Sequence, residues 1–543
     1  MGKNPLLIIL IGTIVWSLTM VKSGLVYSYG MGFWGPNGHD GVWHISLISS
    51  LSRFNLQIPI FAGSILKNYH FGLDLILAAI HLITRIEVRF LYFQLLPPIL
   101  AFGIGYYAFK FIFSWTRNYK ASLWSLFFVY FGGSFGWLVN LFRGKGLGGE
   151  SMFWSQQSIS TLINPPFALS ILIIFYCLYC MSKFSTKVSS PRLITTSILI
   201  GSLTMIKIYA AILFLPGLAI ASIFEPRFRK LFILSVFISL LFYLPFNWKA
   251  TSLVVFQPFW FLENMLALSD RFNWLRLYQA MTAYKATHNL IKFIPAYSLA
   301  ALIFIIGNLG FRITGFLYLI NHKKFNPIEI ILWVMAGLGF LLPLFFVQRG
   351  TPWNTIQFFY YTQFIIGLFT ARWIAARKNF LLIGSCILLT IPTTIDTLKH
   401  YLPSNPPAKI SHLELSALKF LSDQPAGVVF TPPVRPDPYS PAPRPLYLYE
   451  STAYVSAFSN HPVYLEDTVN LDITGYPWKD RLNESNQFMS NTNIDSTKSF
   501  LSANKIRYLY LPQVATVRPN FSASQLGGEV IYENSQVSIW QIE

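Results

Sequence analysis

The chain has 543 residues, of which 53% are hydrophobic and 12% are charged, whereas about a quarter of the residues of a soluble domain carry a charge. Its formal net charge of +19 would suggest a nucleic-acid partner if the protein were soluble. Here the basic residues stand in short segments between long apolar runs, as in multipass membrane proteins, so we expect no nucleic acid as a partner.

Long apolar runs fill the first part of the chain, and most approach the roughly 20 residues that a helix needs to cross a bilayer. They cover residues 5–21, 91–113, 121–142, 167–181, 193–224, 231–246, 294–310, 328–346, 356–371 and 380–395. The run 193–224 is too long for one span, and Pro216 with the polar Lys207 predicts two helices or one broken helix there. We therefore expect a polytopic α-helical membrane protein with about eleven transmembrane helices.

The basic residues predict the orientation of these helices, because cytoplasmic loops carry an excess of Lys and Arg. Counted from a cytoplasmic N-terminus, every basic cluster falls inside the cell if the run 193–224 crosses the membrane twice. The clusters are Arg117 and Lys120; Lys183, Lys187 and Arg192; Arg227, Arg229 and Lys230; Arg312, Lys323 and Lys324; and Arg372, Arg377 and Lys378. The segments 22–90, 143–166, 247–292 and 347–355 then face outward from the plasma membrane, as does the C-terminal part.

The composition changes after residue 402, because only nine of the 22 acidic residues precede that point. Helices are predicted at 413–421 and 495–503, and strands at 427–431, 463–465, 508–511, 529–532 and 537–542. We therefore expect a transmembrane domain of residues 1–402, whose first outer loop is 22–90, and a small extracytoplasmic α/β domain of residues 403–543. This domain holds Glu450, Glu466, Asp467 and Asp472, and we interpret most of these four acids as solvated loop residues.

Asp and His residues gather in the first outer loop, in the stretches GPNGHDGVWH and NYHFGLD. Asp40 and His44 are four positions apart, and so are His70 and Asp74. If these stretches are helical, each pair lies on one helix face. His39 stands directly before Asp40.

One hypothesis gives this cluster a chemical role. Asp40 accepts a proton from an acceptor hydroxyl, or binds a divalent cation that neutralises a phosphate. His44 supports the catalysis, and His39, His70 and Asp74 contribute to substrate binding. The alternative is structural: Asp40 caps an interfacial helix, and the histidines hydrogen-bond to the backbone or to lipid head groups.

A second candidate site is the tight outer loop 347–355 with the helix that follows it. Arg349 at the start of that helix, beside free backbone N–H groups, suits a lipid phosphate, and the polar Asn354 and Gln357 come next as substrate-binding candidates. Lys207 falls in mid-membrane, where a charge is costly unless it is solvated or paired. We interpret it as a second phosphate ligand. The alternative is that both cations are anchors that reach the head groups.

The layout and several stretches resemble a known family. An Asp-bearing first outer loop, about eleven spans and a C-terminal outer domain are similar to the GT-C superfamily of polytopic membrane glycosyltransferases, which use polyprenyl-phosphate sugars. The stretches HDGVWH, NYHFG, TPWNTIQFFYYTQF and YLEDTVNLDITGYPWKDR resemble bacterial and archaeal branches of that superfamily.

The resemblance implies inverting transfer of a hexosyl or pentosyl group from a polyprenyl-phosphate donor to a glycan, lipid or protein acceptor at the outer face of the membrane. It maps the family's first-loop acid onto Asp40, as a base or as a ligand of Mg²⁺ or Mn²⁺, and its phosphate contact onto Arg349 or Lys207. Many members carry two acids in this loop, whereas here His39 precedes Asp40 and Gly41 follows it. No nucleotide or redox cofactor is expected.

Two other functions compete with glycosyl transfer. A transporter or flippase of lipid-linked glycans would have paired broken helices in two related halves, and the sequence shows no clear internal repeat. A non-catalytic membrane scaffold would use its outer domain to bind a partner. The P-loop, the Rossmann glycine pattern and the serine-hydrolase motif are all missing from the sequence, which disfavours nucleotide-driven pumps and serine hydrolases.

Overall fold

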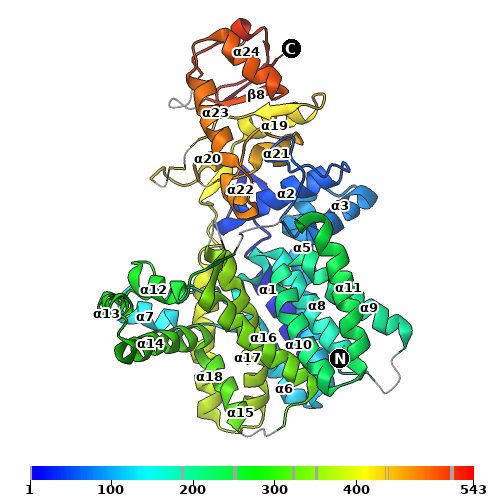
Figure 1. Cartoon of the computed structure of the whole chain (residues 1–543), viewed down its shortest axis with the longest axis vertical. Helices are drawn as coiled ribbons and strands as arrows, with labels where there is room; N and C mark the ends of the chain where they lie inside the picture. The colour runs from blue at the N-terminus through cyan, green and yellow to red at the C-terminus, as the bar shows by residue number, and fades with distance from the viewer. Residues whose placement is uncertain are drawn as a thin grey trace. The chain divides into compact units, whose positions relative to one another are not determined.

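The computed structural model of the protein describes residues 3–184, 189–248, 254–320, 324–348, 352–434, 436–437, 439–449, 451–513 and 519–542 (Figure 1). The chain divides into two compact units. We call Met1–Thr19 with Pro97–Leu402 the helical unit, and Met20–Leu96 with Pro403–Glu543 the mixed unit. The first outer loop and the C-terminal segment therefore pack together as one unit.

Helices make up most of the helical unit. In chain order they are α1 (Lys3–Ser17), α5 (Leu96–Thr116), α6 (Tyr119–Phe131), α7 (Gly136–Phe142), η3 (Ser158–Ile163), α8 (Pro165–Met181), α9 (Ser190–Ile206), α10 (Ile208–Phe224), α11 (Arg227–Asn247), α12 (Trp260–Ala267), α13 (Leu275–Ala286), α14 (Leu290–Leu309), η4 (Gly310–Phe316), α15 (Leu317–Ile320), α16 (Pro327–Phe345), α17 (Pro352–Ala375) and α18 (Phe380–Leu398), with η marking 3₁₀ helices. Two short strands, β3 (Val254–Phe256) and β4 (Phe346–Gln348), pair antiparallel.

Several of these helices are long and apolar enough to cross a membrane. Among the described residues they are Val88–Thr116, Arg227–Asn247, Leu290–Ile320, Pro327–Phe345 and Phe380–Leu398. The pair α6 and α7, bent by 55°, adds a sixth if it forms one span. A multipass helical membrane protein is thereby confirmed, while the count of about eleven spans stays a prediction.

Two of the predicted apolar runs are interrupted. The run 193–224 forms α9 and α10, as predicted, and the chain is extended at Lys207 between them (φ −158°, ψ 96°). The run 121–142, predicted as one span, instead forms α6 and α7. The chain leaves α6 at Gly132, where a Cβ atom would lie 2.6 Å from the carbonyl oxygen of Phe128, so the observed bend accepts only glycine.

Helix α17 forms the centre of the helical unit, where it packs against α6, α16 and η4. Every residue from Thr355 to Ala371 is buried. Because a helix that is buried on all sides has no lipid-facing stripe, this segment accommodates polar side chains such as Gln357 and Gln363. The polar composition that the sequence shows here therefore reflects contacts with other helices.

The mixed unit contains two four-stranded sheets. The first has the order β1 (Val26–Tyr27), β2 (Gly30–Phe33), β5 (Ala408–Ile410) and β7 (Arg444–Pro445), so strands from both segments of the unit pair directly. β2 and β5 are antiparallel, with Met31 opposite Ile410. The second has the order β6 (Val428–Phe430), β8 (Ile506–Pro512), β10 (Val537–Gln541) and β9 (Glu529–Glu533), with β6 parallel to β8 and the other pairs antiparallel.

The helices of the mixed unit surround these sheets. They are η1 (Gly35–Gly38), α2 (Asp40–Leu51), α3 (Gly72–Thr84), α4 (Val88–Phe90), the π-helix η2 (Leu91–Leu95), α19 (His412–Ser422), α20 (Leu446–Tyr449), α21 (Tyr454–Ser459), α22 (Thr468–Thr474), α23 (Trp478–Ser490), α24 (Ile494–Ala503) and η5 (Ser524–Leu526). Helix α2 packs against α3 and α21, which joins the first outer loop to the C-terminal segment.

Most elements predicted after residue 402 are present. The two helices are α19 and α24, and four of the five strands are β6, β8, β9 and β10. The prediction of a strand at 463–465 was wrong. Val463 makes only an isolated bridge with Val429, and its other backbone hydrogen bonds reach Pro59 and Ala62 of the first outer loop.

Candidate functional site

Asp40 is the first residue of α2. The chain turns through η1, and His39 then takes the N-cap position, from which no side chain caps the helix. Among the described residues, Asp40 is therefore not the helix cap that the structural alternative predicts. A carboxylate in the first turn is favoured by the helix dipole. The side chain of Asp40 is 46% exposed, so part of it is accessible to solvent.

The buried imidazole of His39 joins Asp40 to Asp467. Its Nδ1 lies 2.9 Å from Asp40 Oδ1, and its Nε2 lies 3.1 Å from Asp467 Oδ1. Burial alone would lower the pKa of His39, but the charges and hydrogen bonds of Asp467 and Asp40 outweigh it and raise this pKa well above its ordinary value. His39 is therefore an imidazolium near neutral pH, and both ring nitrogens donate.

Asp467 is fully buried at the N-terminus of α22. It accepts hydrogen bonds from Asn470 Nδ2 at 2.7 Å and from Ser451 Oγ at 3.3 Å. Burial would raise the pKa of Asp467, but the charge and hydrogen bond of His39 and the bonds from Asn470 hold it below its ordinary value. The interpretation as a solvated loop acid, expected for most of the four acids named above, does not hold for Asp467, because it is the buried counter-charge of His39.

The same interpretation fails for its neighbour Glu466. This side chain is buried and accepts hydrogen bonds from the backbone N–H groups of Val455, at 2.7 Å, and Ser456, at 3.1 Å. Burial raises the pKa of Glu466 to about 8. It fixes the start of α21, the helix against which α2 packs.

A second Asp–His pair lies one helix turn further along α2. His44 Nδ1 is 2.7 Å from Asp74 Oδ1, and both side chains are buried. The ring of His44 stacks on Tyr92, with centroids 5.5 Å apart. The sequence pattern paired His44 with Asp40 and Asp74 with His70. In the structure His44 and Asp74 bind each other, because α2 packs against α3.

His70 does not share a helix face with Asp74, because α3 begins at Gly72. It lies in the loop before α3, where its ring stacks on Tyr69 at 4.8 Å. Burial and the neighbouring carboxylates, chiefly Asp74 and then Asp40, raise the pKa of Tyr69 well above its ordinary value. The phenol of Tyr69 thus senses the charges of both Asp40 and Asp74.

The other candidates belong to the helical unit. Lys207 is buried at the break between α9 and α10, with Nζ 3.5 Å from Asn164 Oδ1. Gln357 Nε2 donates to Asn354 Oδ1 at 3.2 Å. Tyr209, two residues after Lys207, donates to Gln348 Oε1 at 2.7 Å. Arg349 lies outside the described residues.

Arg312 was predicted to lie in a cytoplasmic basic loop, but its side chain is 1% exposed. Its guanidinium donates to Gln363 Oε1 at 2.8 Å, to the carbonyl oxygens of Asn308 at 2.9 Å and Leu309 at 3.1 Å, and to Gln157 Oε1. The prediction failed because the helix does not end at residue 310. It continues through η4 into α15, and Arg312 points into the bundle.

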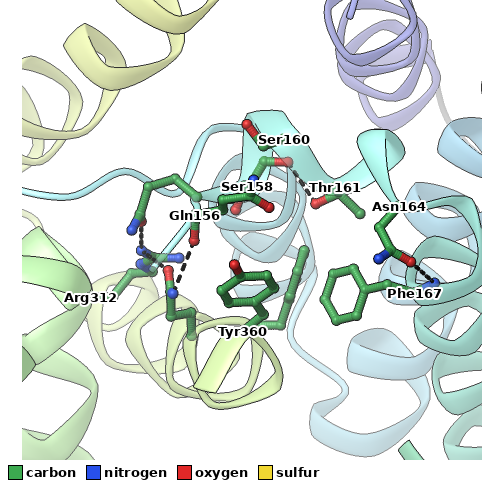
Figure 2. Close-up of a pocket in the computed structure, with 11 residues that line it drawn as sticks. Gln156, Ser158, Ser160, Thr161, Asn164, Phe167, Arg312 and Tyr360 are labelled. Atoms are coloured by element: carbon green, nitrogen blue, oxygen red, sulfur yellow. Dashed lines mark hydrogen bonds between the residues drawn. The ribbon is translucent and has the colours of Figure 1, made fainter. Parts of the chain in front are cut away.

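Arg312 lines one end of a narrow pocket of about 10 Å³, which has room for roughly one water molecule. Figure 2 shows Arg312 and Asn164 on either side of Tyr360, with Ser158 and Thr161 above. Arg312 is the only cation among the residues that line this pocket, and Lys207 contacts one of the lining residues, Asn164.

The chain was compared with known proteins and solved structures. No family model and no curated protein matches the chain. The arabinofuranosyltransferase AftD from Mycobacteria aligns over 100% of this chain and 40% of its own, with 11% identity and a TM-score of 0.51. The chain has a GT-C-like fold. The archaeal oligosaccharyltransferase AglB from Archaeoglobus fulgidus, in complex with an inhibitory peptide and a dolichol-phosphate, covers 94% of this chain and 69% of its own, with 11% identity and a TM-score of 0.49.

The GT-C-like fold confirms the resemblance inferred from the sequence. At 11% identity the likeness concerns the fold alone, and the chain spans 40% of the length of the arabinofuranosyltransferase. The chemistry therefore has to be argued from the residues of the site.

In this GT-C-like chain, the acids and histidines of the site bind one another. His39 uses both ring nitrogens on carboxylates, and His44 uses one on Asp74. Within the described ranges no group of three His, Cys, Asp or Glu side chains is arranged to hold a metal ion. The cation predicted at Asp40 stays a prediction.

Proposed function

We propose that this protein transfers a sugar from a polyprenyl-phosphate-linked donor to an acceptor at the outer face of the membrane. The observation that carries the proposal is the half-exposed carboxylate of Asp40, held by a buried His39–Asp467 pair in the first outer loop of a GT-C-like chain. One polar, charged and oriented group that opens to solvent from a buried network is typical of a catalytic acid or base.

In the proposed reaction, Asp40 acts as the general base. The acceptor O–H or N–H gives its proton to the open oxygen of Asp40 while the acceptor atom bonds to the anomeric carbon. The bond between that carbon and the phosphate oxygen breaks, and its electrons leave with the polyprenyl phosphate. A single displacement of this kind inverts the configuration at the anomeric carbon.

His39 and Asp467 are positioning residues in this scheme. The imidazolium of His39 fixes one oxygen of Asp40, which leaves the other oxygen to face the substrate. The pair His44 and Asp74 holds the next turn of α2 in place, and we assign it a supporting role.

Binding of the donor phosphate is assigned to cations of the helical unit. Lys207 is buried at a helix break beside polar Asn164, and Arg349 is retained from the sequence prediction. A phosphate contact in a site that excludes water is stronger than the same contact in water. A Mg²⁺ or Mn²⁺ held by Asp40 would supply charge neutralisation for a phosphate, and the proton transfer to Asp40 requires no metal.

The test is sugar transfer by the purified full-length protein in lipid nanodiscs, with a panel of polyprenyl-phosphate sugars and radiolabelled or mass-tagged acceptors. Asp40→Asn keeps the shape of the side chain and removes the base. We expect it to lower the transfer rate about 10²- to 10⁴-fold. The matched control is Glu87→Gln, which removes an exposed carboxylate from the same loop and should leave the rate unchanged.

Transfer by Asp40→Asn at the rate of the unsubstituted protein would remove Asp40 from the mechanism. If the unsubstituted protein transfers no sugar but moves lipid-linked glycans between leaflets, the flippase alternative is correct. Neither transfer nor movement, together with a bound partner, would favour the scaffold.

A further inference from the structure

A second, larger pocket lies in the helical unit, and its lining shares no residue with the pocket of Figure 2. It has a volume of about 310 Å³, within the range of pockets that hold small ligands. It forms where α5 ends, α6 begins and α17 ends, and its lining comprises Thr116, Asn118, Ala121, Tyr318, Arg372, Trp373, Ala376 and Arg377. The lining includes two arginines and no acid.

The first arginine, Arg372, is held rigidly. Its Nη1 lies 2.6 Å from Glu329 Oε1, and Tyr318 donates to the same oxygen at 2.7 Å. The guanidinium sits over the rings of Trp115, at 4.3 Å, and Tyr318, at 4.4 Å. Within the described part of the chain its Nε and Nη2 atoms make no hydrogen bond, so an oriented guanidinium edge remains free for a ligand.

The second arginine, Arg377, supplies the charge that Glu329 does not neutralise. It is exposed, its guanidinium lies 4.9 Å from the ring of Trp373, and it has no acidic partner among the described residues. The adjoining loops add Arg117, Lys120 and Lys378, which are also exposed. The pocket is therefore the centre of a concentrated positive charge.

Apolar surface begins directly beside this charge. Phe380 and Leu381, at the start of α18, are 88% and 82% exposed, and Tyr119 at the start of α6 is exposed as well. Tyr and Trp side chains gather where a membrane protein passes from lipid to water. A ligand that combines a phosphate with acyl chains would match both surfaces, whereas free phosphate would use only one.

We propose that this pocket binds the phosphate of an anionic membrane-lipid head group, with Arg372 and Arg377 as its ligands. Guanidinium groups bind phosphate through paired N–H···O bonds, and basic pockets between transmembrane helices suit lipid head groups. The loops involved are those whose basic residues predict a cytoplasmic location, so the site is distinct from the outer-face site of the proposed reaction.

The experiment uses the delipidated full-length protein in detergent, with phosphatidylglycerol or phosphatidylcholine added in mixed micelles, and native mass spectrometry to count retained lipid. The unsubstituted protein should retain one phosphatidylglycerol in preference to phosphatidylcholine. Arg377→Ala should weaken that retention at least about fivefold. Lys230→Ala removes an exposed charge of another basic loop and should have no effect.

A second variant tests the pocket without changing its charge. Ala376→Trp fills the cavity and should also lower retention. Equal losses in Arg377→Ala and Lys230→Ala would attribute binding to overall charge and overturn the proposal, as would normal retention in Ala376→Trp. In a competition series, inorganic phosphate that binds as tightly as phosphatidylglycerol would show that the pocket selects phosphate itself, and would overturn the proposal of a lipid ligand.

Discussion

Asp467 follows His39 by 428 positions in the chain, and its Oδ1 lies 3.1 Å from His39 Nε2. The contact connects the first outer loop to the C-terminal segment at the carboxylate we assign as the base. The C-terminal segment therefore contributes a residue to the candidate site.

Asp467→Asn should reduce sugar transfer about 10- to 100-fold, as the loss of an outer-shell partner does in other sites. Without this buried carboxylate the pKa of His39 falls, so His39 loses its proton at a lower pH and fixes Asp40 less well. The measurement is the pH profile of the transfer rate, whose alkaline limb should move to lower pH. The control is Asp472→Asn, which changes a carboxylate of the same helix that accepts a hydrogen bond from Trp478 and not from His39. Identical profiles for Asp467→Asn and the unsubstituted protein would show that Asp467 does not act through His39.

His44 and Asp74 should behave as one energetic unit. Removing one member of a buried hydrogen-bonded pair costs about 1–3 kcal/mol, because the polar group of the other is left without a partner. We therefore expect the double variant His44→Gln, Asp74→Asn to be destabilised by much less than the sum of the two single variants. Thermal unfolding of the four proteins in one detergent measures this coupling. Additive effects would mean that the 2.7 Å contact contributes no stability.

Glu466 predicts a pH dependence of stability. Its pKa in the folded protein is about 8, above the ordinary value of about 4.3. Between these values the folded protein keeps a proton that the unfolded chain releases, so the stability contributed by Glu466 is full below the unfolded pKa, falls as the pH rises toward the folded pKa of about 8, and changes no further above it. Glu466→Gln cannot ionise, and its melting temperature should exceed that of the unsubstituted protein near pH 8.

The measurement is the melting temperature of both proteins from about pH 5 to about pH 9. His39 also loses its proton at alkaline pH, but it does so in both proteins, so the difference between the two curves reports Glu466. Parallel curves across the range would show that Glu466 is already ionised in the folded state.

Local pattern was enough to predict much of the fold. Apolar runs gave the helices of the helical unit, and the break at Lys207 followed from a charge and a proline in a run that was too long. The bend after α6 was not predictable in this way, because it depends on how close Gly132 comes to the backbone of Phe128. Likewise, the length of the apolar run did not show that the helix continues past Gly310.

The sequence pointed to some residues of the candidate site and missed others. The scarcity of acids before residue 402 drew attention to Asp40 and Asp74, and the fold brings both close to histidines. Asp467 was missed because its partner is distant in sequence, and a single sequence carries no sign of that contact. The only local signal was an acid directly before a helix in YLEDTVN, where Asp467 accepts a hydrogen bond from the backbone of Asn470.

Arg312→Lys should destabilise the helical unit severely. The guanidinium joins η4 to Gln157, which precedes η3, and to Gln363 of α17, and the single ammonium of lysine cannot reach all of these oxygens. Each buried acceptor left without a donor costs about 1–3 kcal/mol. We expect a melting temperature lower by several degrees or more and a lower yield of folded protein. Arg229→Lys, at an exposed position of α11, is the matched control and should melt normally. If Arg312→Lys melts at the same temperature as the unsubstituted protein, the buried guanidinium is not what holds these elements together, and its place at the pocket of Figure 2 would have to be explained by ligand binding alone.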